Sequence, residues 1–430
     1  MRFIYKLYSL RHQVRNLKFY SASIIYVLAS FMGYGISFVQ NFSFAFFLSI
    51  EFFGKVTILF SLFSTLYVLF TLGLNSVVMR FFFDKKYAAS ERQFISTIVV
   101  IWGFFGLCLC LLLSLLGYFL ILQRHFLLID YYSEFLPILV GSFLFSFIEI
   151  FVCFFIVKEE PIKYAIGLVV SRLTIFLLLH ASIYLFQESS FHFALSILFS
   201  GLAQFVIASI FFKVYPIRKV DKGHVREIVL YSLPLMLYAL GGIGYSHGYR
   251  IVISSWLSLS NFAVFSFTAQ ITQIYYLTAS SSVTGFYPKA YKALEDSNGQ
   301  ARSINFYFRI LLSLGLFLAV CVLPVGYLLL KYFKGGQYFE GSKILPVLFI
   351  GQFVFLLYGY NYILCTYYKR TDILTYSMLA GVMVSLFTAW VLLPESRLWG
   401  AALPTLAGLT IQFMLSWFLV QRVSHKAVLL

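Results

Sequence analysis

The residues that could carry chemistry in this 430-residue chain are a few charged side chains inside long apolar runs. Glu149 is the only acid deep within such a run, and Arg172 lies in the next run. The turn between the two runs is centred near residue 160.5, so each side chain lies about 17 Å from it along a helix. Because isolated charges are costly in hydrocarbon, we expect the two to pair at one depth. The pair is either purely structural or a site for a substrate or ion, with Glu149 as the acid for ion coupling.

Three further cations are candidates for binding an anionic substrate. Arg250 lies about 20 residues into an apolar run. It either snorkels to the membrane interface or meets an anionic group. Arg80 and Lys289 each end a run on the side that we predict to be cytoplasmic. They are either plain anchors or a cationic rim that gathers anionic headgroups.

An unusual polar stripe marks the segment 262–284, in which ten of 23 residues are Ser, Thr or Gln. Lipid does not tolerate such a stripe on a membrane helix. It therefore either lines water or bonds to a neighbouring helix, and its two glutamines are candidate substrate-binding residues. The stripe consists of Ser266, Gln270, Gln273, Ser280 and Thr284.

Catalytic motifs are absent from the sequence. It contains no carboxylate pair, nucleophile elbow, phosphate-binding glycine loop or cluster with metal-ligand spacing. The glycines Gly241, Gly242 and Gly244 lie in an apolar run, where they favour helix packing or flexing over phosphate binding. We predict no catalytic residue, no metal, no cofactor and no enzymatic activity.

The elements that position these residues follow from composition. The chain is 61% hydrophobic and 11% charged, whereas a soluble domain is about 25% charged. A bilayer crossing needs about 20 apolar residues. The runs are too long for barrel strands, and we predict an all-α polytopic membrane protein with twelve transmembrane helices. The predicted spans are 20–47, 56–78, 94–122, 134–157, 164–186, 192–214, 229–254, 262–285, 304–330, 344–365, 372–393 and 398–421.

The net charge of +16 would suggest nucleic acid in a soluble protein, but here the positive-inside rule explains it. With the N-terminus in the cytoplasm, 24 Lys and Arg residues fall on the cytoplasmic side and 6 on the other. We therefore predict that both termini are cytoplasmic and that the protein does not bind nucleic acid.

An internal repeat divides the chain into two halves. Segment 47–56 resembles segment 256–265 at an offset of 209 residues, and Gln204 matches Gln412 at an offset of 208. We predict a six-helix half at 1–214, a cytoplasmic linker at 215–228 and a second six-helix half at 229–430. Two halves of the same orientation, related by pseudo-symmetry, are a transporter architecture.

Short motifs are spread over the whole chain: Phe53-Gly54, Gly73-Leu74 with Arg80, Ser232-Leu233-Pro234-Leu235, Pro288 and Trp399-Gly400-Ala401-Ala402. In combination they resemble the Wzx-type polysaccharide flippases, members of the superfamily that also contains multidrug and toxin extruders and lipid II flippases. A departure from the pattern is Tyr249-Arg250, which stands where an Asp-Arg pair is common and leaves a bare cation.

The resemblance implies translocation of a polyprenyl-pyrophosphate-linked oligosaccharide across a bacterial inner membrane for O-antigen or related lipopolysaccharide synthesis. It also implies alternating access, possible coupling to protons or sodium, and contact with membrane lipids and other polysaccharide-assembly membrane proteins. Two alternatives stay open. A membrane-embedded O-antigen polymerase would be expected to carry one long periplasmic loop, and a drug or cation extruder of the same superfamily would need an anionic cavity.

Overall fold

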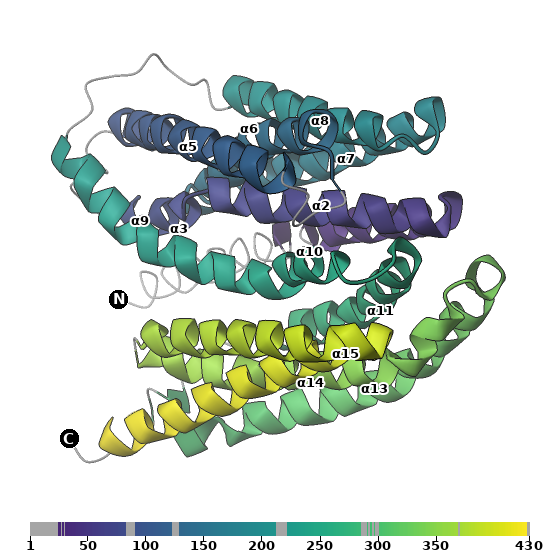
Figure 1. Ribbon diagram of the computed structural model, residues 1–430. Coiled ribbons are helices and arrows are strands. Elements are labelled where there is room, and N and C mark those ends of the chain that lie inside the picture. The colour runs from purple at the N-terminus through teal and green to yellow at the C-terminus, as the bar shows by residue number, and fades with distance from the viewer. Residues whose placement is uncertain are drawn as a thin grey trace, which may run out of the picture. The chain divides into compact units, whose positions relative to one another are not determined.

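The computed structural model describes residues 25–427 apart from 27, 30, 83–90, 123–128, 212–221, 285–289, 291–292, 295, 297–300 and 369. Within these ranges the chain is helical and contains no strand (Figure 1). Residues 31–47 are helical. The α-helices that follow are α2 (Ile50–Phe70), α3 (Leu74–Phe81), α5 (Glu91–Leu122), α6 (Leu136–Val157), α7 (Pro161–Phe186), α8 (Ser190–Phe211), α9 (Lys222–Ile243), α10 (Tyr249–Ser254), α11 (Leu259–Thr284), α13 (Asn305–Tyr332), α14 (Leu345–Tyr367) and α15 (Thr371–Ala427).

Nine stretches in the described part of the chain are long and apolar enough to cross a membrane. They coincide with nine of the twelve predicted spans. The predicted spans 229–254 and 262–285 fall on α9–α10 and on α11, which are not among these nine and which include side chains outside the described part. The predicted span 20–47 lies partly outside the described residues. The all-α polytopic fold is confirmed, and the cytoplasmic position of both termini stays a prediction.

The helix α15 is a hairpin of two limbs, Asp372–Pro394 and Leu398–Val423. Ser385 donates a hydrogen bond of 2.9 Å to the carbonyl of Pro404, 19 residues further on. In a straight helix these residues would lie about 28 Å apart. The chain therefore folds back on itself near residue 395, and the two limbs appear as separate rods in Figure 1. They match the predicted spans 372–393 and 398–421.

The internal repeat is visible in the positions of the helices. The helix α2 begins at Ile50 and α11 begins at Leu259, again an offset of 209 residues. The repeated aromatic residues Phe53 and Phe262 are both fully buried. Gln204 and Gln412 are fully buried as well. The repeat therefore reflects equivalent local structure in two parts of the chain.

The described chain packs as two compact units. One contains residues 1–44 and 63–239, and the other contains residues 45–62 and 240–430. The segment 45–62 belongs to the first half by sequence but packs with the second unit. The half boundaries at 214 and 229 stay a prediction, and much of the linker 215–228 lies outside the described residues.

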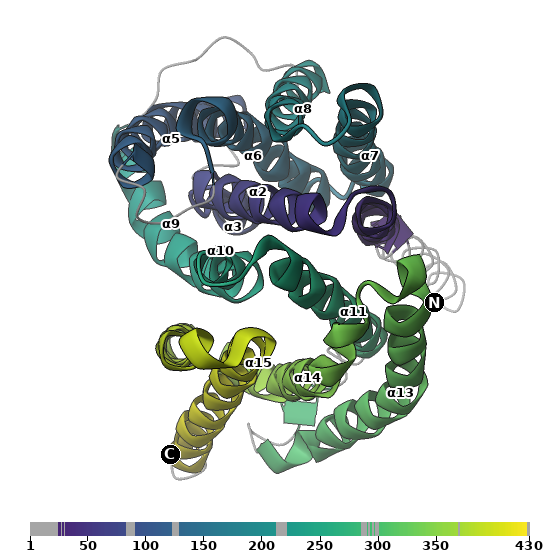
Figure 2. The same cartoon turned by 45° about the vertical axis from the view of Figure 1, so that its right-hand side comes forward.

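The first unit is built around α6, which packs against α3, α7 and α8 (Figures 1 and 2). Helices α6 and α8 approach most closely at Gly141 and Gly201, where a Cβ on Gly201 would overlap the backbone carbonyl of Gly141. Small residues permit this close contact between membrane helices. Trp102 of α5 stacks on Phe143 of α6 with a centroid distance of 4.5 Å and thereby extends the core toward α5.

The second unit combines α11, α13, α14 and α15 with the short segment 333–343 between α13 and α14. Tyr338 in this segment is fully buried. Its hydroxyl donates a hydrogen bond of 3.1 Å to the carbonyl of Ala45, and Lys334 Nζ donates to the carbonyl of Leu48. The segment 333–343 therefore holds residues 45–48 in this unit through hydrogen bonds to their backbone.

Candidate functional site

The predicted pairing of Glu149 and Arg172 is present in the first unit. Arg172 on α7 donates a hydrogen bond of 2.9 Å from Nη2 to Oε1 of Glu149 on α6. The tight connection between α6 and α7 sets this register, because α6 ends at Val157 and Pro161 opens α7. Both side chains are about one quarter exposed, at 22% for Arg172 and 24% for Glu149. The pair remains accessible from one side.

Aromatic residues surround the pair. The Arg172 guanidinium lies 5.9 Å from the centre of the Phe145 ring, within the range of a cation–π interaction. The side chains of Tyr34 and Tyr67 are also close enough to interact with it electrostatically. Next to Arg172, the carbonyl of Ser171 accepts a 2.9 Å hydrogen bond from Gln204 of α8. Glu149 compensates the charge of Arg172, so this site is nearly neutral overall.

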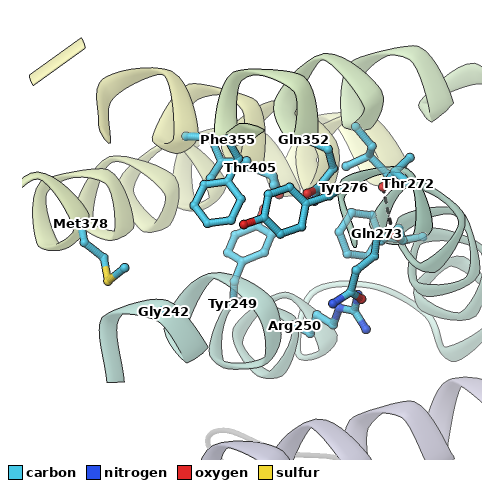
Figure 3. A pocket seen from close by; sticks show the side chains of 14 residues that line it. Gly242, Tyr249, Arg250, Thr272, Gln273, Tyr276, Gln352, Phe355, Met378 and Thr405 are labelled. Carbon is cyan, nitrogen blue, oxygen red and sulfur yellow. Dashed lines mark hydrogen bonds between the residues drawn. The ribbon is translucent and has the colours of Figure 1, made fainter. Parts of the chain in front are cut away.

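A pocket with a volume of about 140 Å³ lies in the second unit (Figure 3). Helices α9, α10, α11, α14 and α15 all contribute to its wall, and Figure 3 shows side chains entering it from several of them. Its lining residues are Gly242, Tyr249, Arg250, Phe265, Ala269, Thr272, Gln273, Tyr276, Leu348, Gln352, Phe355, Met378, Thr405 and Leu409.

Arg250 is the only charged residue among the described residues that line this pocket. The structure gives its guanidinium no hydrogen bond or ion pair with any described residue. Arg250 lines this pocket and is partly exposed, and its role in binding an anionic group stays a prediction. Among the residues that the structure describes, this positive charge is uncompensated.

An irregular stretch of backbone orients Arg250. The π-helical turn Gly244–Gly248 separates α9 from α10. Such turns change the angular phase of the residues that follow, and they are frequent at functional sites. Directly after the turn, the buried Tyr249 donates a 2.8 Å hydrogen bond from its hydroxyl to the carbonyl of Ala401. This bond fixes the rotation of α10 and thereby the direction of Arg250.

The glycines before this turn and at its first position have the packing role expected for them. A Cβ on Gly241 would lie 2.5 Å from Sδ of Met378, and one on Gly244 would touch Val382 at 3.6 Å. Close packing of α9 and of the π-helical turn Gly244–Gly248 against α15 thus requires small residues here. The π-helical turn itself was not expected from the sequence, although four glycines between residues 241 and 248 are a signal for it.

The predicted polar stripe on α11 is divided between two environments. Gln273 lines the pocket, whereas Gln270 is only 6% exposed and is not part of the pocket wall. Oε1 of Gln270 and Oγ of the buried Ser266 have no hydrogen-bond partner among the described residues. The side chains of Ser280 and Thr284 lie outside the described part. Within that part, one glutamine of the stripe faces the cavity and the other lies inside the helix packing.

Of the two remaining predicted cations, the structure describes Arg80 and does not bring it to either site. Arg80 is exposed in the last turn of α3, where its charge suits the negative end of the helix dipole. Lys289 lies outside the described residues. The prediction of a cationic rim therefore stays a prediction.

The sequence analysis missed several pocket residues from distant parts of the chain. Gln352 and Phe355 come from α14, Tyr276 from α11 and Thr405 from α15. Gln352 carried a usable signal, because it is one of few polar residues in the apolar run 344–365. Tyr276 and Phe355 face each other at a centroid distance of 4.8 Å. No group of three His, Cys, Asp or Glu side chains able to hold a metal occurs within the described ranges.

The helical spans and the internal repeat define a multi-pass membrane protein with a transporter fold. Residues 21–293 match the family model described as polysaccharide biosynthesis protein, and the chain belongs to this family. The predicted resemblance to polysaccharide flippases is thus confirmed at the level of family and fold. No curated protein matches the chain.

Solved structures of membrane transporters share the fold. The lipid II flippase MurJ in an inward closed conformation is similar with a TM-score of 0.68 and 16% identity, over 93% of this chain and 87% of that one. An inward-facing multidrug resistance MATE family transporter of the MOP superfamily is similar with a TM-score of 0.67 and 12% identity, over 91% of this chain and 94% of that one. A MOP superfamily transporter from Pyrococcus furiosus is similar with a TM-score of 0.60 and 14% identity, over 94% of this chain and 96% of that one.

Proposed function

We propose that this protein flips a polyprenyl-pyrophosphate-linked oligosaccharide from the cytoplasmic to the periplasmic leaflet of a bacterial inner membrane. The product would serve the synthesis of O-antigen or a related surface polysaccharide. Membership in the polysaccharide biosynthesis family and the flippase and transporter fold support this proposal. A pyrophosphate that carries several sugars cannot cross hydrocarbon unaided, which is the physical need that such a protein meets.

The observation that carries the proposal is the charge of Arg250, which has no partner among the described residues, in the pocket of the second unit. None of the 14 residues that line this pocket is Asp or Glu. A cation without a protein partner in a low-dielectric site favours an anionic ligand. The same charge disfavours the alternative of a drug or cation extruder, which needs an anionic cavity. Gln273, Gln352 and Tyr276 add polar groups that suit a hydroxylated ligand.

In the proposed cycle the protein alternates between states open to either side, while the polyprenyl tail stays in lipid. Arg172 and Arg250 would attract the headgroup, and Arg80 and Lys289 would gather it at the cytoplasmic face. Glu149 is the acid through which a proton or sodium gradient would act. The proposed translocation uses no catalytic residue and no cofactor. Contacts with other polysaccharide-assembly membrane proteins belong to the same proposal.

Deletion of the gene tests this function against the remaining alternative, a membrane-embedded polymerase. Loss of a flippase leaves unpolymerised lipid-linked repeat units on the cytoplasmic face. Loss of a polymerase leaves single repeats attached to lipid A. Complementation with Arg250→Gln and with Arg309→Gln, which removes an exposed charge outside the pocket, separates the pocket charge from net charge. Capped single repeats in the deletion strain would refute the flippase.

A further inference from the structure

The size of the Arg250 pocket limits what it can hold. Its volume of about 140 Å³ is well below the roughly 300–1,000 Å³ of pockets that enclose drug-sized ligands. A complete oligosaccharide repeat unit is larger than a drug-sized ligand. The pocket therefore suits one charged group or one sugar ring of a larger substrate, and it is a subsite rather than the whole transport cavity.

The charge of the pocket indicates which kind of anionic group it can bind. One arginine supplies a charge of +1, and the wall contains no lysine, second arginine or acid. A pyrophosphate carries at least two negative charges, so that a single arginine would compensate its charge only in part. A carboxylate carries one negative charge, and its two oxygens match the planar fork of a guanidinium.

The neutral side chains of the pocket wall suit a sugar ring. The side chains of Gln273 and Gln352 have no hydrogen bond to any residue in the described part of the chain, and each amide offers donors and an acceptor. Sugar hydroxyls need both functions at once. Tyr276 and Phe355 supply an aromatic surface for the apolar face of a sugar ring. Inorganic phosphate or pyrophosphate would make no use of that surface.

From these three features we infer that the pocket binds an acidic monosaccharide of the uronic-acid type within the translocated oligosaccharide. Its carboxylate pairs with Arg250, its hydroxyls bond to Gln273 and Gln352, and its ring lies against Tyr276. The inference rests on the proposed flippase function and names the substrate class that this site selects.

Ligand-dependent thermal unfolding of the purified full-length protein in detergent tests the inference. The probes are methyl glucuronide, methyl glucoside and pyrophosphate, which share either the ring or the negative charge. Methyl glucuronide is expected to raise the unfolding midpoint and the other two to act at least about tenfold more weakly. Loss of one charge-assisted interaction corresponds to about a tenfold to hundredfold change in affinity.

Variants assign the effect to the pocket. Arg250→Gln should abolish the response to methyl glucuronide, and Gln352→Leu should weaken it. Arg309→Gln, which removes an exposed charge from α13, should respond like the unmodified protein. If Arg250→Gln fails to fold, Arg250→Lys keeps the charge without the fork and should bind more weakly, and the ranking of the three probes on the unmodified protein remains decisive.

Three outcomes would overturn the inference. A response to pyrophosphate that equals or exceeds the response to methyl glucuronide would assign the pocket to the diphosphate. An equal response to methyl glucoside would assign it to neutral sugars, and no response to any probe would remove the subsite. If any of these occurs while the protein still translocates lipid-linked repeats, the flippase function stands and only the acidic-sugar subsite fails.

Discussion

Arg172 and Glu149, 23 residues apart on consecutive helices, form an ion pair with 2.9 Å between Nη2 and Oε1. Removal of either partner leaves an uncompensated charge inside a membrane helix, at a cost of about 2.5 kcal/mol or more. We expect Glu149→Ala and Arg172→Ala each to lower the amount of folded protein or its transport activity. Size-exclusion chromatography of a fluorescent fusion measures the folded amount.

The charge exchange Glu149→Arg with Arg172→Glu separates the two roles of this pair. A structural pair regains both folded amount and transport, whereas a substrate-binding Arg172 regains folded amount alone, because the cation has moved to another helix. Lys163→Ala is the matched control, since Lys163 pairs with Glu160 at the surface and such pairs contribute about 0–1 kcal/mol. Normal transport by Arg172→Ala would rule out the functional role.

Cysteine labelling distinguishes the two glutamines of α11. We expect Gln273→Cys to react with a small aqueous thiol reagent, because Gln273 lines the pocket. Gln270→Cys should react much more slowly, since Gln270 is 6% exposed and outside the pocket wall. Ile271→Cys, at 1% exposure, is the protected control. Equal labelling at 270 and 273 would show that water reaches the whole stripe.

The contact between Gly141 and Gly201 predicts a strong effect of a single methyl group. Gly201→Ala should lower the free energy of unfolding by about 1–3 kcal/mol, because its Cβ would force α6 and α8 apart. Gly103→Ala is the control, since a Cβ there meets no atom within 4 Å. It should leave stability unchanged or slightly higher, because alanine is the better helix former. Thermal unfolding in detergent measures both, and equal midpoints would contradict the close packing.

The segment 333–343 should stabilise the second unit through Tyr338. Tyr338→Phe removes the hydroxyl that donates to Ala45 and is expected to cost about 0.5–1.5 kcal/mol, seen as a lower unfolding midpoint. Tyr332→Phe at an exposed position, with 67% of the residue accessible, should have no such effect. If the two variants unfold alike, the bond to Ala45 contributes nothing measurable.

The orientation of the chain is tested at the two ends of α7. Lys163 and Gln187 are both exposed and lie 24 residues apart, or about 36 Å along a helix, which exceeds the hydrocarbon thickness of about 30 Å. Lys163→Cys should react with an impermeant reagent only after the membrane is opened, and Gln187→Cys should react from outside. The reverse pattern would invert the predicted topology.

The helices, the α15 hairpin and the pairing of Glu149 with Arg172 could all be predicted from the sequence. Hydropathy and helical rise are local properties, so the run lengths and the equal distances from the turn at 160 suffice. The tertiary structure alone decided which polar residues share a pocket. Arg250 faces it because a π-helical turn and the bond from Tyr249 to Ala401 set the rotation of α10. Gln352 and Thr405 join it because α14 and α15 pack beside α11, and such rotations and contacts between helices distant in sequence have no local signal.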